Sequence, residues 1–493
     1  MRCAEETREF RQKEFKSGAD ADSSRRKRSQ KTIEIRKQKR SETLTKKRSV
    51  SITEKEVEYD PQLLHSDDPT IVQEGLKQIR EAISGDTNST KIIAEKLITS
   101  ENIMHIINCC KSTNLSIKAI RDAIWIVTNV LSITSPLITP LLQRSPIIPY
   151  MIDLYQHSDR DIRDQALWCV GNIIGENLSY RQVFLQRNII PVITHSLETE
   201  YNSLIANQKD EEKSCDRISN QLWTLSNLLT LPAPPLNITS CCLPIIGKFL
   251  LFNHYDIAQN AVTCLYLMSK NLSEQDICLF MQSGVLNEKT LKLLFYSAPV
   301  CEHMMKTCGN MLAGSPEVTQ VLLDIGILRY LENQISSGNV SMRREVCWML
   351  SNIVAGTSAQ IDIFTRAGFL PKIIQCLTDD VWEVKRECIY IISNIVLSNH
   401  PLHIEKVTSS DVLPLLSDLM NVTIEMTFII LEIFEKIFEY AKNIGMLEKY
   451  CELFEEIGAL EKIEQLQYSD LEILRGKADN IINYFPTTMD INE

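Results

Sequence analysis

The feature that most constrains this chain is an internal repeat with a period of about 42 residues. Five segments carry an aromatic residue followed four positions later by Asn: AIWIVTNVLS, ALWCVGNIIG, QLWTLSNLLT, VCWMLSNIVAG and CIYIISNIVLS. With three weaker copies, the first position of the pair falls at residues 125, 168, 223, 263, 306, 348, 390 and 432, at spacings of 43, 55, 40, 43, 42, 42 and 42. This period is typical of helical units that stack into a solenoid.

The repeats are predicted to be helical because apolar residues recur at helical spacing from about Gln62 onward, and alternation of period two is rare. The fold class is therefore all-α, a right-handed armadillo-repeat superhelix (an α-solenoid) in which one helix of every unit lines a concave groove. The polar stretch 198–213 accounts for the one long spacing, and we expect it to be an exposed loop.

Small residues that tolerate a left-handed backbone precede similar segments within the units. Gly284, Gly326 and Gly368 are followed by apolar residues, and Asn188 takes the same place in another unit. Such residues end helices, so each is predicted to separate two helices of one unit.

The charge is distributed unevenly along the chain. Residues 1–50 carry 17 Lys and Arg against 8 Asp and Glu, whereas the remainder carries 35 basic and 55 acidic residues. Residues 1–60 are predicted to be a basic arm and linker, disordered until bound; 61–485 about ten armadillo repeats; and 486–493 a short tail. An acidic body indicates that cationic ligands bind to it, and the arm is one candidate.

Several functional classes are excluded by what the sequence lacks. Its 15 cysteines include no C-x-x-C pair, so we expect reduced thiols and no metal site. No run of 18 apolar residues and no secretory leader occur, which indicates a soluble intracellular protein. The nucleophile, phosphate-loop and zinc-protease motifs are absent, so neither an enzyme nor a cofactor is expected.

The aromatic residue and the Asn of each pair share one helix face, and two interpretations of that face compete. A Trp at helical spacing is most often a core residue. However, four of the five Trp residues share one phase of the repeat and the same Asn partner, for which a core has no evident use. Asn can pair with a bare peptide backbone, and stacked indoles can hold Lys and Arg heads at roughly 0.5–2 kcal/mol each. We therefore predict a groove for an extended basic peptide.

This array resembles the importin alpha family of receptors for basic nuclear localisation signals. FEEIGALEKIEQLQ at residues 454–467 is similar to that family's last repeat, and RRKRSQKTIEIRKQKRSETLTKKRS at 25–49 resembles its importin-beta-binding segment. The resemblance implies a nuclear import adaptor that binds cargo proteins with basic signals in its groove and links them to importin beta. It also implies an arm that is autoinhibitory when free.

The resemblance implies further partners and a location. An export receptor would recycle the protein, and nuclear pore components would be met indirectly. The protein would shuttle between cytoplasm and nucleus, without membrane insertion and without binding a specific nucleic acid.

Two sets of groove residues follow from the resemblance. The major signal-binding site would comprise Trp125, Asn129, Gln165, Trp168, Asn172, Glu176, Asn220, Trp223 and Asn227. The minor site would comprise Lys306, Asn310, Trp348, Asn352, Glu387, Tyr390 and Asn394. Ile133 and Ile138 replace the expected turn after Asn129, Glu176 replaces an Asp, and Pro316 replaces an acidic anchor. The minor site is therefore expected to be weaker.

The basic arm has its own residue set. The importin-beta-binding and autoinhibitory residues would be Arg25, Arg26, Lys27, Arg28, Arg36, Lys37, Lys39, Arg40, Lys46, Lys47 and Arg48. The competing interpretations are a solvated charge run or a non-specific nucleic-acid tail. For the whole chain, the alternative is an armadillo scaffold that binds other partners without import activity.

Overall fold

The computed structural model describes residues 59–83, 87–133, 135–206, 211–230, 232–296 and 298–485. Every regular element within these ranges is an α-helix or a short 3-10 helix, as the all-α prediction requires. None of these helices is long and apolar enough to cross a membrane. The predictions for the arm residues between Arg25 and Arg48 and for the tail 486–493 lie outside the described residues. The chain divides into two compact units, Met1–Met268 and Ser269–Glu493.

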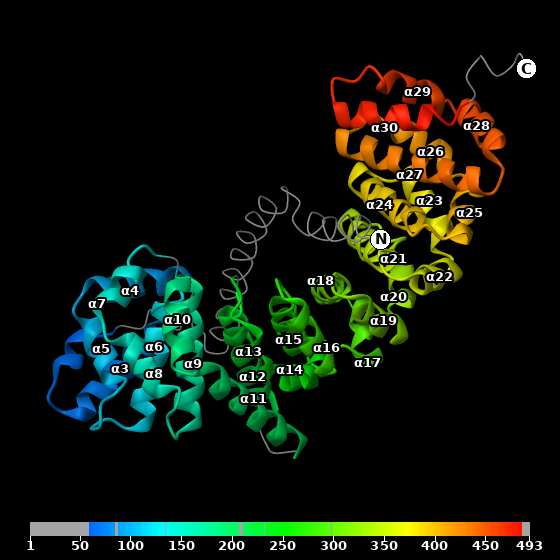
Figure 1. Ribbon diagram of the computed structural model, residues 1–493. Coiled ribbons are helices and arrows are strands. Elements are labelled where there is room, and N and C mark those ends of the chain that lie inside the picture. Colours follow the sequence, from blue (N-terminus) through cyan, green and yellow to red (C-terminus); the bar gives the residue numbers. More distant parts are fainter. Residues whose placement is uncertain are drawn as a thin grey trace, which may run out of the picture. The chain divides into compact units, whose positions relative to one another are not determined.

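The first unit is organised around a series of long helices that pack one on the next (Figure 1). These are α3 (Pro69–Ile83), α6 (Ile117–Val130), α9 (Arg160–Glu176), α12 (Glu211–Leu228) and α15 (Tyr255–Met268). The other helices of this unit are η2 (Pro61–His65), α4 (Thr87–Thr99), α5 (Asn102–Cys109), α7 (Ile138–Arg144), α8 (Ile147–Leu154), η3 (Leu178–Tyr180), α10 (Arg181–Gln186), α11 (Ile189–Ile205), α13 (Leu236–Thr239), η4 (Ser240–Cys242) and α14 (Leu243–Leu250).

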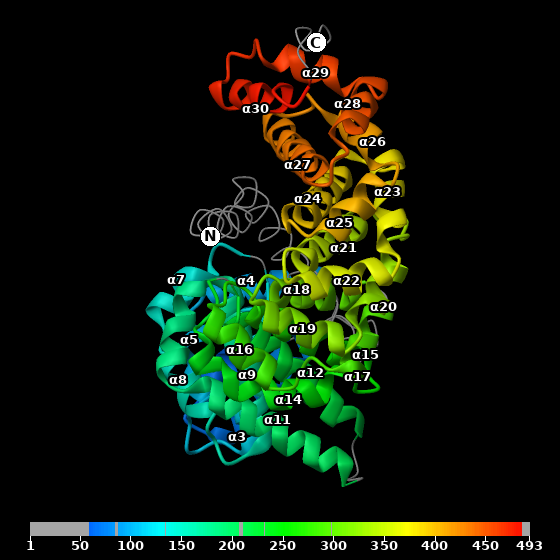
Figure 2. The ribbon, with the colours of Figure 1, turned by 45° about the vertical axis from the view of Figure 1, so that its right-hand side comes forward.

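The second unit repeats the arrangement, and Figure 2 shows its long helices in succession from yellow-green to red. They are α18 (Val300–Leu312), α21 (Val340–Val354), α24 (Trp382–Leu397), α27 (Ile424–Asn443) and α30 (Glu472–Ile482). The others are α16 (Glu274–Gln282), α17 (Glu288–Leu291), η5 (Lys292–Phe295), α19 (Pro316–Asp324), α20 (Ile327–Gln334), α22 (Ser358–Arg366), α23 (Phe369–Asp379), α25 (Pro401–Thr408), α26 (Val412–Leu419), α28 (Leu447–Glu456) and α29 (Ala459–Leu466).

Left-handed residues set the break between the first and second helix of several repeats. Asn188, Gly326 and Gly368 have φ values of 56°, 86° and 76° and directly precede α11, α20 and α23. Gly284 also has a positive φ, of 70°. The prediction from the sequence is confirmed at all four positions, because this backbone region is open to Gly and tolerated by Asn.

The hydrophobic core lies between successive repeats. All residues of α9 from Ala166 to Ile174 are buried, and nine consecutive residues point in every direction around the helix. A helix buried on most of its surface needs neighbours on both sides, so a single repeat cannot bury its own apolar residues. The stack therefore stabilises every helix within it, and it fixes the face that each long helix leaves exposed.

The prediction of an exposed loop at 198–213 is wrong. Helix α11 continues to Ile205, α12 begins at Glu211, and Glu200 is 1% exposed. The Nε of Arg160 on α9 donates to Glu200 Oε1 at 2.6 Å. The stretch is polar, but its buried carboxylate is paired with a cation from the preceding repeat, so the helix can extend where a loop was expected.

Candidate functional site

The predicted major-site residues lie on three consecutive helices of the first unit. Trp125 and Asn129 belong to α6; Gln165, Trp168, Asn172 and Glu176 to α9; and Asn220, Trp223 and Asn227 to α12. Trp125 and Trp223 are half-buried, whereas Trp168 is only 6% exposed. Since α6 packs on α9 and α9 on α12, the three aromatic positions follow one another in order along the stack.

A cavity of about 430 Å³ opens along this series of helices. Four of the predicted site residues line it: Trp125, Gln165, Trp168 and Asn220. Its remaining lining residues are charged, and the sequence prediction did not include them. The cations are Arg80, Lys118, Arg121, Lys213 and Arg217, and the anions are Asp122, Asp161, Asp164 and Asp216.

This balance corrects the expectation of an acidic groove. Five cations of the chain face four anions around the cavity, so the net negative charge of the body is carried elsewhere. Arg80 of α3 shows the effect most directly, because its guanidinium lies 5.5 Å from the centre of the Trp125 ring and also donates to the Asp122 carboxylate. An arginine of the protein therefore already lies over Trp125, the first aromatic residue of the predicted major site.

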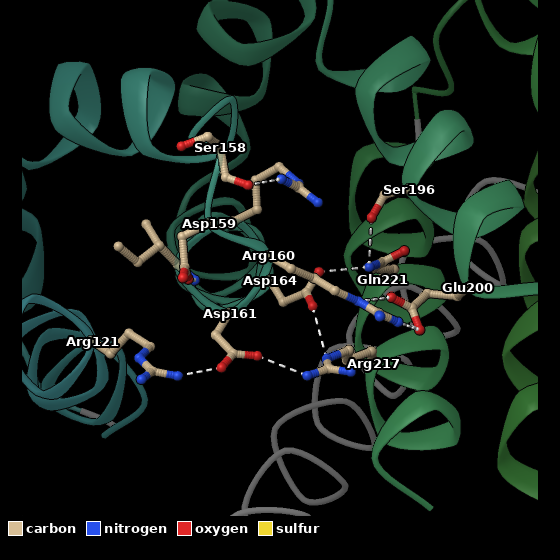
Figure 3. Close-up of polar contacts among 12 residues, drawn as sticks. Arg121, Ser158, Asp159, Arg160, Asp161, Asp164, Ser196, Glu200, Arg217 and Gln221 are labelled. Atoms are coloured by element: carbon tan, nitrogen blue, oxygen red, sulfur yellow. Dashed lines mark hydrogen bonds and ion pairs between the residues drawn. The ribbon is translucent and has the colours of Figure 1, made fainter. Parts of the chain in front are cut away.

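A second group of ion pairs ties α6, α9 and α12 together (Figure 3). Asp161 accepts from Arg121 on one side and, at 2.7 Å, from Arg217 on the other. Arg217 Nε also lies 3.0 Å from Asp164 Oδ2, and Gln221 Nε2 donates to Asp164 Oδ1 at 2.9 Å. Burial, with the nearby Glu200 charge, raises the pKa of Asp164 to about 6. The carboxylates along the cavity are held in place by the arginines that partly neutralise them.

The Asn residues of the repeat make a regular contact with the preceding repeat. The Nδ2 atoms of Asn172, Asn227 and Asn394 donate to the backbone oxygens of Thr128, Gly171 and Ser351 at 2.9, 3.0 and 3.0 Å. In each case the acceptor is the residue directly before the preceding repeat's Asn. Asn129 differs, since its Nδ2 donates to Trp125 of its own helix at 2.8 Å.

This contact corrects the argument that a core has no use for the amide. Asn172 has no exposed surface, Asn227 is 3% exposed, and both amides join adjacent helices. The Oδ1 of Asn172 is buried and has no hydrogen-bond partner within the described part of the chain. A bound peptide could pair with this oxygen only after a neighbouring side chain had moved.

The aromatic residues pack on the same point of the preceding helix. A Cβ atom on Gly171 would lie 2.4 Å from Cζ3 of Trp223, and one on Gly309 would lie 2.4 Å from Cζ3 of Trp348. Sequence reasoning missed this requirement, although a signal was present. The residue before the Asn is small in all five clear copies and in the weaker copy at Asn310: Thr128, Gly171, Ser226, Ser351, Ser393 and Gly309.

The predicted minor-site residues lie on α18, α21 and α24 of the second unit. Lys306 and Asn310 belong to α18; Trp348 and Asn352 to α21; and Glu387, Tyr390 and Asn394 to α24. Asn310 Nδ2 donates to Ser269 Oγ at 2.9 Å, whereas the Nδ2 of Asn352 is buried and has no partner among the described residues. The aromatic and amide positions of this set therefore recur in order, but their hydrogen bonds are less regular.

Two predicted minor-site side chains are engaged within the protein. The Tyr390 hydroxyl donates to Glu425 Oε1 at 2.5 Å, and burial together with this bond raises the pKa of Tyr390. Glu387 is buried beside Arg386, whose Nη2 lies 3.2 Å from Glu387 Oε1, and burial raises the Glu387 pKa. Both groups would exchange an internal partner for a ligand.

Two further sequence features can be located. Glu176 is the last residue of α9 and is half-buried, and it follows Gly175, where a Cβ would lie 3.7 Å from Asn227 Nδ2. Ile133 and Ile138 are 9% and 0% exposed, so they belong to the core between repeats. Glu176 thus follows directly after the position that faces the third Asn of the major set, whereas the two isoleucines offer little surface to a ligand.

Comparison with known proteins agrees with this architecture. The importin beta binding domain family matches residues 11–108. Importin subunit alpha-8 of Arabidopsis thaliana is 26% identical over 431 residues, covering 86% of this chain and 92% of that protein. Importin subunit alpha-1a of Oryza sativa subsp. japonica is 25% identical over 502 residues, covering 97% and 92%. The chain is similar to importin alpha subunits over most of its length, and its N-terminal part matches the importin beta binding domain.

One solved structure supports the fold. A crystal structure of an engineered protein covers 86% of the chain and 97% of its own length, with a TM-score of 0.64 and 16% sequence identity. A designed armadillo repeat protein in complex with the peptide (KR)4 covers 50% of the chain at 25% identity and a TM-score of 0.44. At 16% identity, the first similarity concerns the fold alone.

We predict that Gly171→Ala destabilises the protein by about 1–3 kcal/mol, because the new methyl group would overlap the Trp223 indole and force it to move. The matched control is Gly175→Ala in the same helix, where the new Cβ would make an ordinary contact. Ala also favours a helix by up to about 1 kcal/mol over Gly, so the control should be neutral or stabilising. Denaturant unfolding followed by tryptophan fluorescence measures both; equal stability of the two variants would contradict the packing described.

Proposed function

We propose that this protein is a nuclear import adaptor that binds cargo proteins carrying basic nuclear localisation signals and links them to importin beta. The observation that carries the proposal is the match to the importin beta binding domain over residues 11–108, followed by a helical-repeat body similar to importin alpha subunits. The match includes the basic residues between Arg25 and Arg48. A transport adaptor acts by binding, and no catalytic step is assigned to it.

The groove residues proposed for the signal are those of the major and minor sets. An extended peptide would lie across the long helices, with lysine and arginine stems between successive aromatic side chains. Their charges would meet the carboxylates of Asp161 and Asp164 near the start of α9 and the carboxylate of Glu176 at its end. The Tyr390 hydroxyl and the Glu387 carboxylate already have internal partners, which supports a weaker minor site.

Signal binding at the first slot competes with Arg80. Because this guanidinium lies over Trp125 and bonds to Asp122, an incoming cation must displace it or bind beyond it. Part of the cation–π and ion-pair energy of the complex is therefore already present in the free protein. The affinity for a basic peptide reflects the difference between the two cations.

We predict that Arg80→Gln tightens the binding of a single-cluster basic peptide about 2- to 30-fold, the range that corresponds to one cation–π contact. The control is Lys248→Gln, which removes the same charge from a cation placed 4.8 Å from the Tyr201 ring, a contact outside the cavity. Fluorescence anisotropy with a labelled peptide measures both variants, and thermal melting checks that they fold. If the Arg80→Gln variant binds the peptide no more tightly than the control, Arg80 does not compete with the peptide for Trp125.

The arm is proposed to occupy the groove when importin beta is absent. A linker of about a dozen residues gives a tethered basic segment an effective concentration of about 1 mM, so even a weak internal ligand competes with cargo. When importin beta binds the arm, the groove becomes free for cargo. Binding of cargo to this protein would thus depend on the presence of importin beta.

We predict that deleting residues 1–55 tightens signal-peptide affinity tenfold or more, about 1.4 kcal/mol, and abolishes importin beta binding. Calorimetry with the full and the shortened chain measures both effects. The full chain with saturating importin beta is the matched comparison, because it should bind peptide as tightly as the deletion. Equal affinity with and without the arm would remove the inhibitory role, while loss of importin beta binding alone would leave the adaptor role in place.

Glu176 is proposed to anchor the principal lysine of the signal. It ends α9 next to the position that contacts Asn227, and a lysine between the second and third Trp would reach its carboxylate. We predict that Glu176→Arg lowers peptide affinity at least about 100-fold through one lost charge-assisted bond and one new repulsion. Glu176→Asp should keep the affinity within about threefold. Unchanged circular dichroism shows that both fold, and a Glu176→Arg variant that binds like the parent would refute the assignment.

The remaining partners follow from the adaptor role. The protein is proposed to shuttle between cytoplasm and nucleus, to be returned by an export receptor, and to meet nuclear pore components only through importin beta. A scaffold without import activity is distinguished by the same reagents, because it would bind neither importin beta nor basic peptides.

A further inference from the structure

Three cysteines from separate helices meet in the second unit. Cys347 lies on α21, Cys376 on α23 and Cys388 on α24, and their Sγ atoms all lie within 4.8 Å of one another. The Sγ atoms of Cys347 and Cys388 are 3.7 Å apart. All three are buried, with Cys376 the most accessible at 8% exposed. The cluster joins two neighbouring repeats.

The distances suit a metal ion bound by thiolates. A Zn–S bond of about 2.3 Å with tetrahedral angles places two sulfur atoms about 3.8 Å apart. The Cys347–Cys388 pair already has this separation. Each remaining pair is at most 4.8 Å apart, so it needs an approach of about 1 Å at most, which side-chain rotation can supply. Such a site would consist of three thiolate ligands and one open coordination position on the metal.

Buried cysteine is more often a small apolar residue, and this chain shows that use as well. Cys308 on α18 is fully buried, and Cys301, the ionisable group that acts on its pKa, lies on the same helix. Among the described residues, Cys347, Cys376 and Cys388 are the set whose donor atoms come close enough for one ion. The repeat explains why the sequence hides this set: Cys347 and Cys388 are 41 positions apart, in no local motif.

An ion pair lies beside the cluster. Arg343 on α21 donates through Nε and Nη2 to the two carboxylate oxygens of Asp380, at 2.6 and 2.7 Å. Cys347 and Cys376 both lie within electrostatic range of this guanidinium. Arg343 and Asp380 form a neutral pair beside the cluster, and three thiolates around a divalent cation would add one net negative charge to it.

We propose that Cys347, Cys376 and Cys388 form a binding site for one soft, thiolate-preferring metal ion of the Zn²⁺ or Cu⁺ type. Soft sulfur ligands select these ions over Mg²⁺ or Ca²⁺. Binding replaces the thiol protons by the metal, so each ligand that binds releases its proton. The ion would clamp α21, which carries Trp348, to α23 and to α24, which carries Tyr390. The site does not depend on the proposed transport function.

The test uses the full chain, reduced and freed of metal, titrated with Cd²⁺ as a spectroscopic probe of thiolate ligation. We expect thiolate-to-metal charge-transfer absorption that saturates at about one ion per chain and a higher melting temperature for the loaded protein. Cys376→Ala should lose this absorption, whereas the control Cys308→Ala, also a buried cysteine of the second unit, should keep it. A parent without a saturable signal, or a Cys376→Ala variant that binds as tightly, would overturn the proposal.

A second measurement does not depend on how the variants fold. Alkylation of the parent followed by peptide mass spectrometry should show Cys376 protected at least tenfold by the bound ion, while the exposed Cys241 continues to react. The same spectra detect a Cys347–Cys388 disulfide through the loss of two hydrogens. If that disulfide forms in air and cadmium gives no protection, the cluster is a redox pair and the metal site is refuted.

Discussion

The structure depends on one contact, the packing of each long helix on the long helix of the preceding repeat. At the centre of this contact, an Asn amide donates to a backbone carbonyl, as in Asn172 to Thr128 and Asn227 to Gly171. An aromatic ring packs at the same level, over a small residue such as Gly171. Because this hydrogen bond fixes the rotation of the helix, the residues one turn earlier must face the same side in successive repeats. The order of the groove residues along the stack therefore follows from a hydrogen bond that holds the repeats together.

Much of the architecture could be predicted from the sequence, because the period, the helical spacing and the left-handed Gly and Asn positions are local signals. The errors arose where long-range pairing decides. Glu200 pairs with Arg160, 40 positions away, and this turned an expected loop into helix. Arg80 pairs with Asp122, 42 positions away, and this places a cation where an acidic surface was expected. Net charge gives no information on which residues meet across repeats.

The groove is therefore better described as a set of exchangeable ion pairs than as an acidic surface. Arg80, Arg121 and Arg217 hold the carboxylates along the cavity, and Glu425 holds the hydroxyl of Tyr390. If a basic ligand binds there as proposed, it gains new bonds only while these internal bonds are given up, so its selectivity would depend on small differences between similar interactions. Such a surface would discriminate between signals by the position of their charges as well as by their number.

The acceptor in the Asn contact is a backbone carbonyl, which every amino acid provides. The donor and acceptor are 44 positions apart for Asn172, 56 for Asn227 and 43 for Asn394, and the three bond lengths agree within 0.1 Å. This hydrogen bond requires no particular side chain in the neighbouring repeat, except that the residue whose carbonyl accepts it must be small. Repeats can then be lengthened, duplicated or exchanged in evolution without a matching change in the neighbour. The inserted turns of α11 are an example of that freedom within this chain.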